Sequence, residues 1–514
     1  MTGAPRAIAI SNLDLPDAQQ LLLHDCEDCA CPVSATADSP LAAAALAPAA
    51  DLDGPGRWVR GREVISVGLD ADHQVLFNPV GHGGAVVVNE EAQRIFRCFQ
   101  EPVTFGDAFR EAGPGPGREA EVRDLFRRLG QLELIHPEGA DERPELPRGE
   151  VLTAWLHITN ACNLRCPYCY LSKTAESMSE DTGRASVDAV ISSAVREGYP
   201  AIKLKYAGGE ASLNHRHLVG LHAYAKERAA AAGLQLQATL LSNGVSLPAG
   251  LIDVLRSESI RVMISLDGIG AAHDAQRPFV SGRPSFRQVE RTIASLVGKG
   301  YGPHLSITIT GRNAAGVPDV VRFALDRDLT FSLNFFRDND QAAGLSDLQY
   351  EEQAMIAALL GSFEVIAGRL PRWSVLGSVL DRGQLLQPRE RSCGVGQDYV
   401  VIDQRGRVAK CHMEIERTLG DVFRDDPLQL VRRDTGPGTA QNLPVTEKAG
   451  CRDCTWRYWC TGGCAVATFR ATGRSDIKSP NCNIYKAIYP EALRLEGLRL
   501  LRYAAPAQAA AGRP

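Results

Sequence analysis

The chain has 514 residues, too many for one ordinary domain, so three or four units of about 150 residues are expected. Hydrophobic residues make up 44% and charged residues 23%, a globular composition that excludes a fibrous or wholly disordered chain. The net charge of -5, from 56 basic and 61 acidic residues, leaves no positive excess for binding phosphates. Nucleic acid and anionic membranes are therefore not expected as main partners.

The N-terminus and the cysteine content predict a cytoplasmic protein. No apolar run approaches the roughly 18 residues that cross a membrane. The opening MTGAPRAIAISNLDLPDAQQ lacks a charged leader followed by an apolar stretch. In the reducing cytoplasm, the 14 cysteines are better explained as metal ligands or catalytic groups than as disulfides.

The first 60 residues predict a flexible segment, because residues 35–56 are rich in Ala, Pro, Asp and Gly and show no apolar period. Within it, HDCEDCACP places Cys26, Cys29 and Cys31 close together. These cysteines could bind metal or mimic a substrate, although unpaired surface thiols are the simpler interpretation. From Arg62 to about residue 140, short strand-like runs precede two helical ones, which predicts a small ordered unit.

Between residues 151 and 345, strand-like runs alternate with helical ones. The strand-like runs are residues 154–160, 201–207, 236–243, 261–268, 304–310 and 330–336. Apolar strands joined by helices favour a parallel sheet covered by helices, either an open barrel or a doubly wound sheet. In both architectures the functional site lies at the carboxyl ends of the strands.

Three cysteines follow the first of these strands. The segment NACNLRCPYCY places Cys162, Cys166 and Cys169 in the spacing C-x3-C-x2-C, with Tyr168 before the last. Three thiolates can hold three irons of a cubane cluster and leave the fourth iron open, whereas tetrahedral zinc needs a fourth ligand. The spacing resembles that of the radical SAM enzymes, whose open iron binds the amino and carboxylate groups of S-adenosylmethionine. Three structural cysteines without a cluster are the disfavoured alternative.

Polar residues at the ends of later strands extend this resemblance. The second strand ends in YAGGE, where Gly208 and Gly209 permit close approach of a ligand and Glu210 can accept from an ammonium group. The resemblance implies that this segment holds the methionine amino group. It also implies cofactor-binding roles for the following residues: Tyr168, Ser242, Asn243, Ser265 and Asp267.

The segment HDAQR resembles one found in the peptide-modifying branch of the radical SAM enzymes. In that branch the arginine pairs with the methionine carboxylate, and this role is carried to Arg277. His273 in the same segment is interpreted as a structural histidine rather than a proton carrier.

Seven more cysteines gather near the C-terminus: Cys393, Cys411, Cys451, Cys454, Cys460, Cys464 and Cys482. Their order is similar to the SPASM domain of radical SAM enzymes, whereas a zinc ribbon would leave three thiols over. The resemblance implies two auxiliary four-iron clusters. One would be bound by Cys451, Cys454, Cys460 and Cys482, and the other by Cys393, Cys411 and Cys464.

The second auxiliary set lacks a fourth cysteine, since none lies between Cys393 and Cys411. Two interpretations stay open: a substrate ligand binds the remaining iron, or an Asp, a Glu or water does. Asp398 and Glu414 lie in this region and are candidates for the catalytic proton acceptor by position alone, although an ordinary structural role is simpler for both.

The N-terminal unit resembles the peptide-recognition domain related to the pyrroloquinoline quinone biosynthesis chaperone (PqqD-like), a winged helix-turn-helix. The resemblance rests on the pattern of residues 75–99 and of GQLELIHP. It implies that the leader of a precursor peptide binds as an added strand at an exposed sheet edge. Residues 81–137 hold seven Arg, no Lys and nine acidic residues, so the electrostatic footprint of a DNA-binding domain is missing.

Together these signals predict an α/β chain with a partial (β/α)6 TIM-like radical SAM barrel at residues 151–345. Around it we expect a flexible segment (1–60), the winged helix-turn-helix (61–140), a helical bridge (346–392), a SPASM domain (393–485) and a C-terminal helix and tail (486–514).

The resemblance implies a maturase that uses a 5'-deoxyadenosyl radical to install a thioether or carbon-carbon crosslink in a ribosomal precursor peptide. Its cofactors would be S-adenosylmethionine and three [4Fe-4S] clusters, and its electron donor flavodoxin or ferredoxin. One alternative is a sulfatase-maturase-like oxidation of Cys or Ser to formylglycine. Another is a zinc-stabilised winged-helix regulator that binds DNA.

Overall fold

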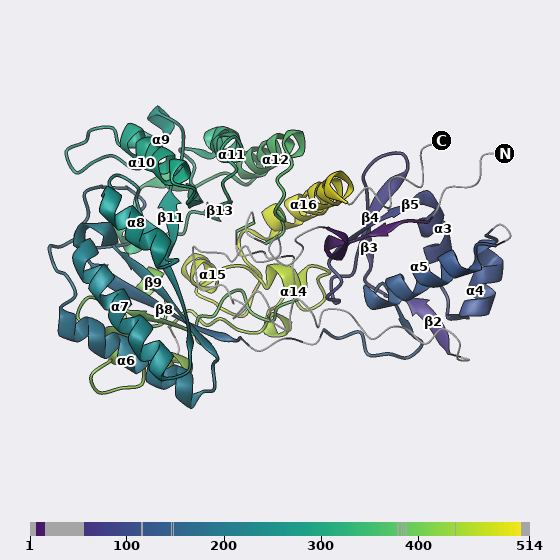
Figure 1. Cartoon of the computed structure of the whole chain (residues 1–514), viewed down its shortest axis with the longest axis horizontal. Helices are drawn as coiled ribbons and strands as arrows, with labels where there is room; N and C mark the ends of the chain where they lie inside the picture. Colours follow the sequence, from purple (N-terminus) through teal and green to yellow (C-terminus); the bar gives the residue numbers. More distant parts are fainter. Residues whose placement is uncertain are drawn as a thin grey trace.

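The computed structural model describes residues 7–15, 56–114, 117–144, 146, 149–377, 380–381, 383, 385, 388–436 and 438–504. Figure 1 shows the N-terminal unit at one end of the molecule and the parallel sheet with its helices at the other, with α14 and α15 between them. Cys26, Cys29 and Cys31 lie outside the described residues. In the part of the chain that is described, no helix combines the length and the apolar character needed to cross a membrane.

The centre of the fold is a parallel sheet whose six strands follow one another in sequence order. The strands are β8 (Val151–Thr159), β9 (Ala201–Gly208), β10 (Gln235–Ser242), β11 (Arg261–Ser265), β12 (His304–Ile309) and β13 (Phe331–Phe335). Each pairs in parallel with the next, for example Leu152 with Ile202 in β8 and β9. The mixed α/β class and all six predicted strands are confirmed.

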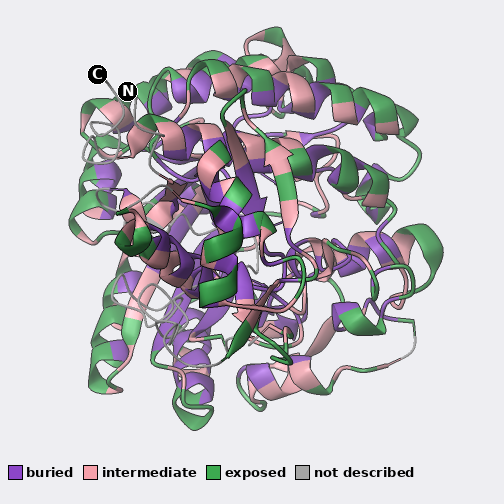
Figure 2. Ribbon diagram, turned by 90° about the vertical axis from the view of Figure 1, so that its right-hand side faces the viewer, coloured by how far each residue is buried: buried purple, intermediate pink, exposed green. Residues whose placement is uncertain are grey.

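Helices cover one face of this sheet, and Figure 2 shows helices along the rim of the molecule with exposed outer faces and buried inner faces. The helices are α6 (Glu180–Arg196), α7 (His215–Ala231), α8 (Ala249–Ser257), α9 (Ala271–Gln276), α10 (Phe286–Gly298), α11 (Val317–Leu325) and α12 (Glu352–Gly368). Alternate residues of β8, such as Leu156 and Ile158, join the core shared with the helices, whereas Trp155 points to the other face. Ser179 caps α6 by accepting from the Thr182 N–H.

The cysteine-rich region continues the same sheet, which the sequence did not reveal. Strand β14 (Tyr399–Ile402) pairs in parallel with β8, and β15 (Arg407–Ala409) and β16 (Thr418–Asp421) follow in antiparallel order. Three helices complete this region: α13 (Pro427–Arg433), α14 (Arg457–Cys460) and α15 (Ala465–Thr472). The last helix, α16 (Cys482–Tyr503), begins before the predicted boundary at residue 486, so that boundary falls inside a helix.

The N-terminal unit holds two small antiparallel sheets and three helices. One sheet has the order β1-β5-β4-β3 and the other β6-β2-β7. Its elements are β1 (Ala9–Ile10), β2 (Arg57–Arg60), β3 (Ile65–Gly68), β4 (His73–Phe77), β5 (Ala85–Asn89), α3 (Glu90–Arg97), β6 (Val103–Thr104), α4 (Phe105–Ala112), α5 (Glu119–Gln131) and β7 (Ile135–Pro137).

Two features of this unit differ from the sequence expectations. Residues 7–15 and 57–60 were assigned to a flexible segment, but β1 and β2 are held in place by pairing with β5 and β7. Helix α4, which has eight residues like α3, was missed. Its signals are the Thr104 cap, which accepts from the Asp107 N–H, and the left-handed Gly113 at its end.

The N-terminal unit packs directly against the C-terminal half of the chain. The fully buried Trp459 lies 4.7 Å from Phe77 between ring centroids, and its indole N–H donates to the Pro79 carbonyl at 2.6 Å. Arg457 forms an ion pair with Glu63. At Gly497 of α16, a Cβ atom would lie 2.3 Å from Val75 Cγ2, so helix and hairpin approach to a distance that only glycine permits. The two parts therefore share one apolar interface.

Candidate active site

A cavity of about 230 Å³ opens at the carboxyl ends of the parallel strands. Cys162, Cys166 and Cys169 line it, in the loop that follows β8. Eight of the predicted cofactor-binding residues also line it: Tyr168, Gly208, Gly209, Glu210, Ser242, Asn243, Ser265 and Arg277. The topology thus brings the ends of β8, β9, β10 and β11 to one site.

The cysteine loop is fixed by polar contacts to its backbone and thiols. The Cys162 sulfur accepts from the Leu164 N–H at 3.4 Å and lies 3.8 Å from Asn243 Nδ2. The Cys169 N–H donates to the Cys166 carbonyl at 3.1 Å. Burial raises the pKa of the Cys166 thiol to about 11. A thiol that is hard to ionise alone becomes a good ligand when a metal supplies the compensating charge.

The two glycines at the end of β9 let the chain pass very close to the cysteine loop. A Cβ atom on Gly208 would lie 2.3 Å from the Thr159 carbonyl oxygen, and one on Gly209 would lie 2.4 Å from that of Ala161. Larger residues would push β9 away from the loop. These glycines therefore shape the cavity wall through backbone packing as well as by leaving room for a ligand.

Glu210 is a buried carboxylate held in one orientation. It is 2% exposed and accepts from the Ser212 N–H at 3.1 Å, the Ser242 hydroxyl at 2.9 Å and the Asn243 N–H at 2.6 Å. Because these donors fix both oxygens, the carboxylate presents a preorganised negative group to the cavity.

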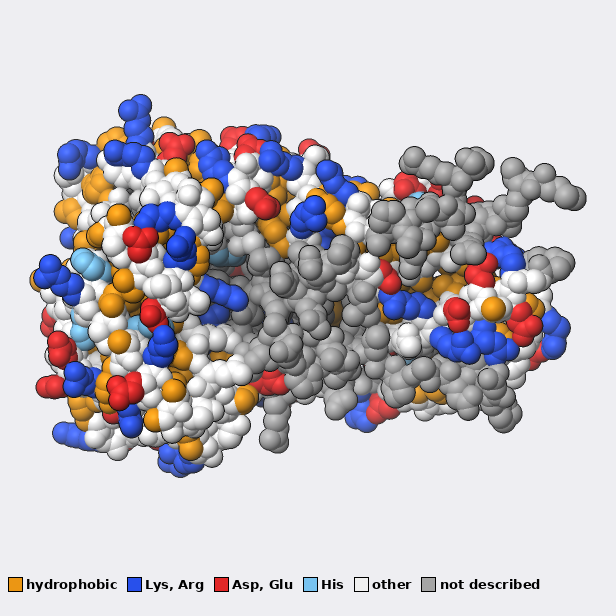
Figure 3. Space-filling view, in the orientation of Figure 1, with side chains coloured by type: hydrophobic (Ala, Val, Ile, Leu, Met, Phe, Trp, Pro, Cys, Tyr) orange, Lys and Arg blue, Asp and Glu red, His pale blue; other side chains and the backbone are white. Residues whose placement is uncertain are grey.

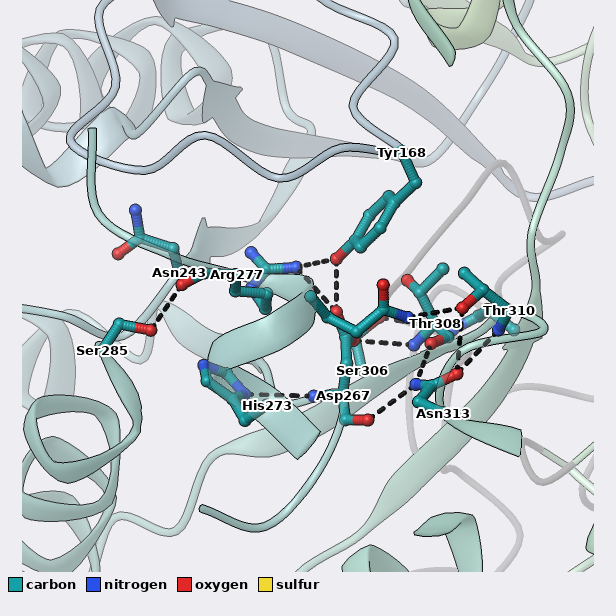
Figure 4. A network of polar contacts seen from close by, with 12 residues as sticks. Tyr168, Asn243, Asp267, His273, Arg277, Ser285, Ser306, Thr308, Thr310 and Asn313 are labelled. Atoms are coloured by element: carbon teal, nitrogen blue, oxygen red, sulfur yellow. Dashed lines mark hydrogen bonds and ion pairs between the residues drawn. The ribbon is translucent and has the colours of Figure 1, made fainter. Parts of the chain in front are cut away.

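Arg277 is positioned from behind by a polar network shown in Figure 4. The Tyr168 hydroxyl donates to Asp267 Oδ2 and accepts from Arg277 Nη1, which lies 3.3 Å from the same oxygen of Asp267. The other oxygen of Asp267 accepts from the Thr308 N–H at 2.9 Å. Asp267 is fully buried and does not line the cavity. In this position Asp267 holds Arg277 and Tyr168, and its predicted role in binding the cofactor stays a prediction.

His273 has the structural role expected for it. Its Nδ1 accepts from the Asp267 N–H at 3.4 Å, and its ring packs edge-on against Phe286 with 6.0 Å between centroids. Burial lowers the pKa of His273 to about 3, so the ring is neutral at physiological pH. A neutral, fully buried ring of this kind supports the loop that carries Arg277.

The cavity also contains residues that no sequence motif indicated. Trp155, Asn334, Arg337, His412 and Met413 line it. The His412 ring stacks on the Trp155 indole with 4.6 Å between centroids, and its Nδ1 lies 3.1 Å from the Tyr399 hydroxyl. The position of His412 directly after Cys411 was a signal, but only the pairing of β14 with β8 shows that it reaches this cavity.

The seven C-terminal cysteines form two groups. Cys451, Cys454, Cys460 and Cys482 line a second, smaller cavity. Cys393, Cys411 and Cys464 belong to one cluster of packed side chains with Val395 and Ala440. Among the described residues, no three His, Cys, Asp or Glu side chains converge as ligands of a single ion would. Cysteines around a cubane need not converge in this way, because each binds a different iron.

Lys448 lies between the two groups of thiols. It is 2% exposed and its ammonium group donates to the Thr461 carbonyl at 2.8 Å. Burial lowers the pKa of Lys448, whereas Cys451, Cys460, Cys393 and Cys464 act in the opposite direction. A buried cation is thus placed where it can offset negative charge on either group.

Neither carboxylate proposed by position as a proton acceptor lines the main cavity. Asp398 precedes β14, and its carbonyl accepts from the N–H of Thr153, six residues before the end of β8. At about 3.3 Å per residue, this places Asp398 roughly 20 Å along the strand from the cysteine loop. Glu414 follows Met413, and burial raises the pKa of its carboxyl. This geometry favours the structural role for Asp398, and a role as proton acceptor stays a prediction for both carboxylates.

We expect Asp398→Asn to remove a pH-dependent loss of stability. Burial raises the pKa of the Asp398 carboxyl to about 6. This pKa lies above the value of about 4 that an aspartate has in an unfolded chain. The folded state therefore favours the protonated carboxyl, whose contribution to the free energy of unfolding is complete below about pH 4 and is lost as pH rises through about 6. Urea unfolding should show Asp398→Asn more stable than the wild type at pH 7, with the difference shrinking toward pH 4. A difference independent of pH would contradict this assignment; the exposed Asp124→Asn serves as the control.

Comparison with known proteins agrees with this geometry. Residues 156–324 match the family model of the Radical SAM superfamily. The PqqA peptide cyclase of Xanthomonas euvesicatoria pv. vesicatoria is 23% identical over 346 residues, which cover 64% of this chain and 87% of that protein. The GTP 3',8-cyclase of a Synechococcus species is 37% identical over 161 residues, 29% of this chain and 44% of that protein.

A solved structure, native anSMEcpe with bound AdoMet and Cp18Cys peptide, has a TM-score of 0.55 and 18% identity, covering 69% of this chain and 99% of its own. These findings define a radical SAM domain on a partial-barrel fold. The chain is an enzyme of the radical SAM type.

Proposed function

We propose that this enzyme is a peptide maturase that installs a thioether or carbon-carbon crosslink in a ribosomally synthesised precursor peptide. The observation that carries the proposal is a cavity lined by three thiols, a fixed carboxylate and a guanidinium, in a chain that also has a small N-terminal unit with a sheet of order β1-β5-β4-β3. The named activity of the PqqA peptide cyclases and the peptide bound to anSMEcpe support a peptide substrate.

The residues of the cavity fit S-adenosylmethionine bound at a four-iron cluster. Cys162, Cys166 and Cys169 would hold the cluster, Glu210 would accept from the amino group of the nucleotide, and Arg277 would bind its carboxylate. Together the two cofactors supply abstraction of a hydrogen atom from an unactivated carbon.

The chain's own contribution is orientation and exclusion of water. Glu210 needs no reorganisation when the ammonium group arrives, because its donors are already in place. Tyr168 and Asp267 hold Arg277 in the same way. Apolar side chains of Trp155, Phe335 and Phe336 line the remaining wall and keep water from the reacting carbon.

The C-terminal thiols would hold two auxiliary clusters that accept the surplus electron, with flavodoxin or ferredoxin as the external donor. The set with three cysteines leaves one iron of its cluster without a thiolate, and two hypotheses remain for its fourth ligand. Either the substrate binds this iron, or an Asp, a Glu or water does. Asn442 Nδ2 donates to the Cys393 sulfur at 3.7 Å. Anaerobic spectra with and without a Cys-containing peptide distinguish them: an unchanged auxiliary signal would defeat the substrate-ligand hypothesis.

Two alternatives predict different products. Oxidation of Cys or Ser to formylglycine leaves an aldehyde, whereas a crosslink does not. A zinc-stabilised regulator predicts zinc, a colourless protein and a basic surface. Figure 3 instead shows basic and acidic side chains interspersed on the face in view.

Co-expression with the product of a neighbouring short reading frame tests the proposal. We expect the peptide to lose the mass of two hydrogen atoms for each crosslink, and tandem mass spectra to show missing fragmentation between the joined residues. A hydrazide probe that labels the product would indicate the aldehyde instead. An unchanged peptide, together with active cleavage of S-adenosylmethionine, would count against this peptide as the substrate.

A further inference from the structure

Residues 7–15 add a strand to the edge of the first sheet of the N-terminal unit, where β1 appears in dark purple in Figure 1. Ala9 pairs with Val88 and Ile10 with Val87, both in antiparallel register. The Asn89 N–H donates to the Ile8 carbonyl at 3.4 Å, and the Ile8 N–H donates to Asn89 Oδ1 at 3.0 Å. The chain thus covers the edge of β5 with its own N-terminal segment.

Two apolar side chains of this segment enter the core. Ile10 and Leu15 are each 5% exposed and pack in the cluster that contains Val75, Phe77 and Val87. Between them, residues Asn12–Asp14 form a single 3-10 turn, η1. The segment therefore presents a strand, a turn and two buried anchors, which is how short peptides occupy a groove along a sheet edge.

An ion pair with α5 supplies the chemical selectivity. Arg128 donates to the Asp14 carboxylate and, at 2.8 Å, to the Ser11 hydroxyl. The Asp14 carboxylate also accepts from the Ser11 N–H at 2.8 Å. The Asp14 and Arg128 side chains are 19% and 22% exposed, so this pair is partly shielded from water. Backbone pairing accepts any extended peptide, whereas Arg128 favours one with an acidic residue at this position.

The segment also reaches the C-terminal helix. Asn12 Nδ2 donates to Glu496 Oε1 at 3.2 Å, and Arg499 donates to Asn12 Oδ1. Glu496 and Arg499 are fully buried. A peptide bound along the edge of β5 in this way therefore also contacts α16, the helix that packs against the N-terminal unit.

The geometry allows exchange with another peptide. Strand β1 has only two residues, and residues 16–55, 40 in number, separate η1 from the rest of the unit in the sequence. Because this segment is covalently joined to the rest of the chain, its binding to β5 is an intramolecular event, which favours the bound state without any further contact. It can therefore occupy the groove even when its intrinsic affinity is weak.

We propose that β5 and α5 form an acid-selecting peptide groove in which Arg128 is the specificity-determining residue and residues 7–15 are the ligand in cis. An incoming segment of the precursor peptide, with an apolar residue, an aspartate four positions later and an apolar residue next, binds by displacing them. The identity of the incoming peptide rests on the proposed function; the occupancy in cis does not.

Fluorescence anisotropy with the full-length protein tests the proposal. The probe is a labelled, end-capped peptide with the sequence of residues 7–15, AIAISNLDL. We expect Asp14→Lys to weaken the ligand in cis and to let the probe bind at least about ten-fold more tightly than to the wild type, since a partly shielded ion pair becomes a like-charge contact. A probe carrying Lys in place of Asp should bind neither protein.

Charge reversal and a matched control sharpen the result. Adding Arg128→Glu to Asp14→Lys restores an ion pair in cis, so the original probe should again be excluded. Asp124→Lys, an exposed change on the same helix, should leave probe affinity as in the wild type. Hydrogen exchange at the Asn89 N–H should rise in Asp14→Lys and fall on addition of the probe, which also shows that the sheet is folded.

Equal probe affinity in the wild type and Asp14→Lys, or affinity independent of the probe's acidic residue, would overturn the groove assignment. The outcome is independent of maturase activity. A crosslinked product without the expected anisotropy results would refute only the groove assignment. The expected anisotropy results without any crosslinked product would refute only the proposed maturase activity.

Discussion

Replacing Cys166 by alanine is expected to abolish cleavage of S-adenosylmethionine by the anaerobically reconstituted, reduced enzyme. The three thiols of the cysteine loop line one cavity, and each would bind one iron of the cluster. Because one iron already lacks a protein ligand, loss of Cys166 would leave two of the four irons without one. Iron content should fall from about twelve to about eight atoms per chain if all three proposed clusters form. Product assays for 5'-deoxyadenosine and iron analysis measure both quantities.

Cys98 provides the matched control. It lies directly after α3 in the N-terminal unit, outside all three groups of thiols. Cys98→Ala should therefore keep both the iron and the cleavage activity. Full iron content and normal cleavage in Cys166→Ala would contradict the assignment of the cysteine loop.

Truncating Trp459 should cause the largest loss of stability at the interface between the N-terminal unit and the rest of the chain. The side chain is fully buried, contacts Phe77 and donates to the Pro79 carbonyl. Trp459→Ala is expected to destabilise this interface by about 3–5 kcal/mol, because it removes a large apolar surface and leaves a cavity. Hydrogen exchange in β4 and thermal unfolding followed by near-UV circular dichroism report the change.

Trp459→Phe separates the two contributions. The phenyl ring retains much of the contact with Phe77 but cannot donate to the Pro79 carbonyl. Loss of this hydrogen bond is expected to lower the free energy of unfolding by about 1 kcal/mol, in addition to any effect of altered packing. If Trp459→Ala left exchange in β4 unchanged, the N-terminal unit would be held by other contacts, such as the ion pair of Arg457 with Glu63.

The sequence predicted the barrel strands well because their apolar runs are long and separated by clear helical patterns. Strands such as β8 and β9 are buried almost throughout, and this pattern is readable without a structure. The ends of these strands could also be placed, since parallel strands bring their carboxyl ends to the same edge. Most predicted cofactor residues therefore line the cavity, although their binding roles remain predictions.

The remaining features depend on pairings between distant parts of the chain. Strand β14 has only four residues, and only its pairing with β8 brings His412 into the cavity. The direction of the Asp267 side chain, away from the cavity and toward Tyr168, is decided by tertiary contacts. Two-residue strand β1 carries no periodic signal at all, because its position is fixed by β5 and α5 rather than by its own composition.

The contact at Gly497 bears on how enzymes of this type could be recombined. Because a single Cβ atom there would overlap Val75, the N-terminal unit and α16 are shaped to one another at the level of individual atoms. A chimera that exchanged only residues 56–137 for the corresponding part of another enzyme would bring a foreign hairpin against this surface. The N-terminal unit would therefore have to be exchanged together with α16 and the Trp456–Trp459 turn, which pack against it.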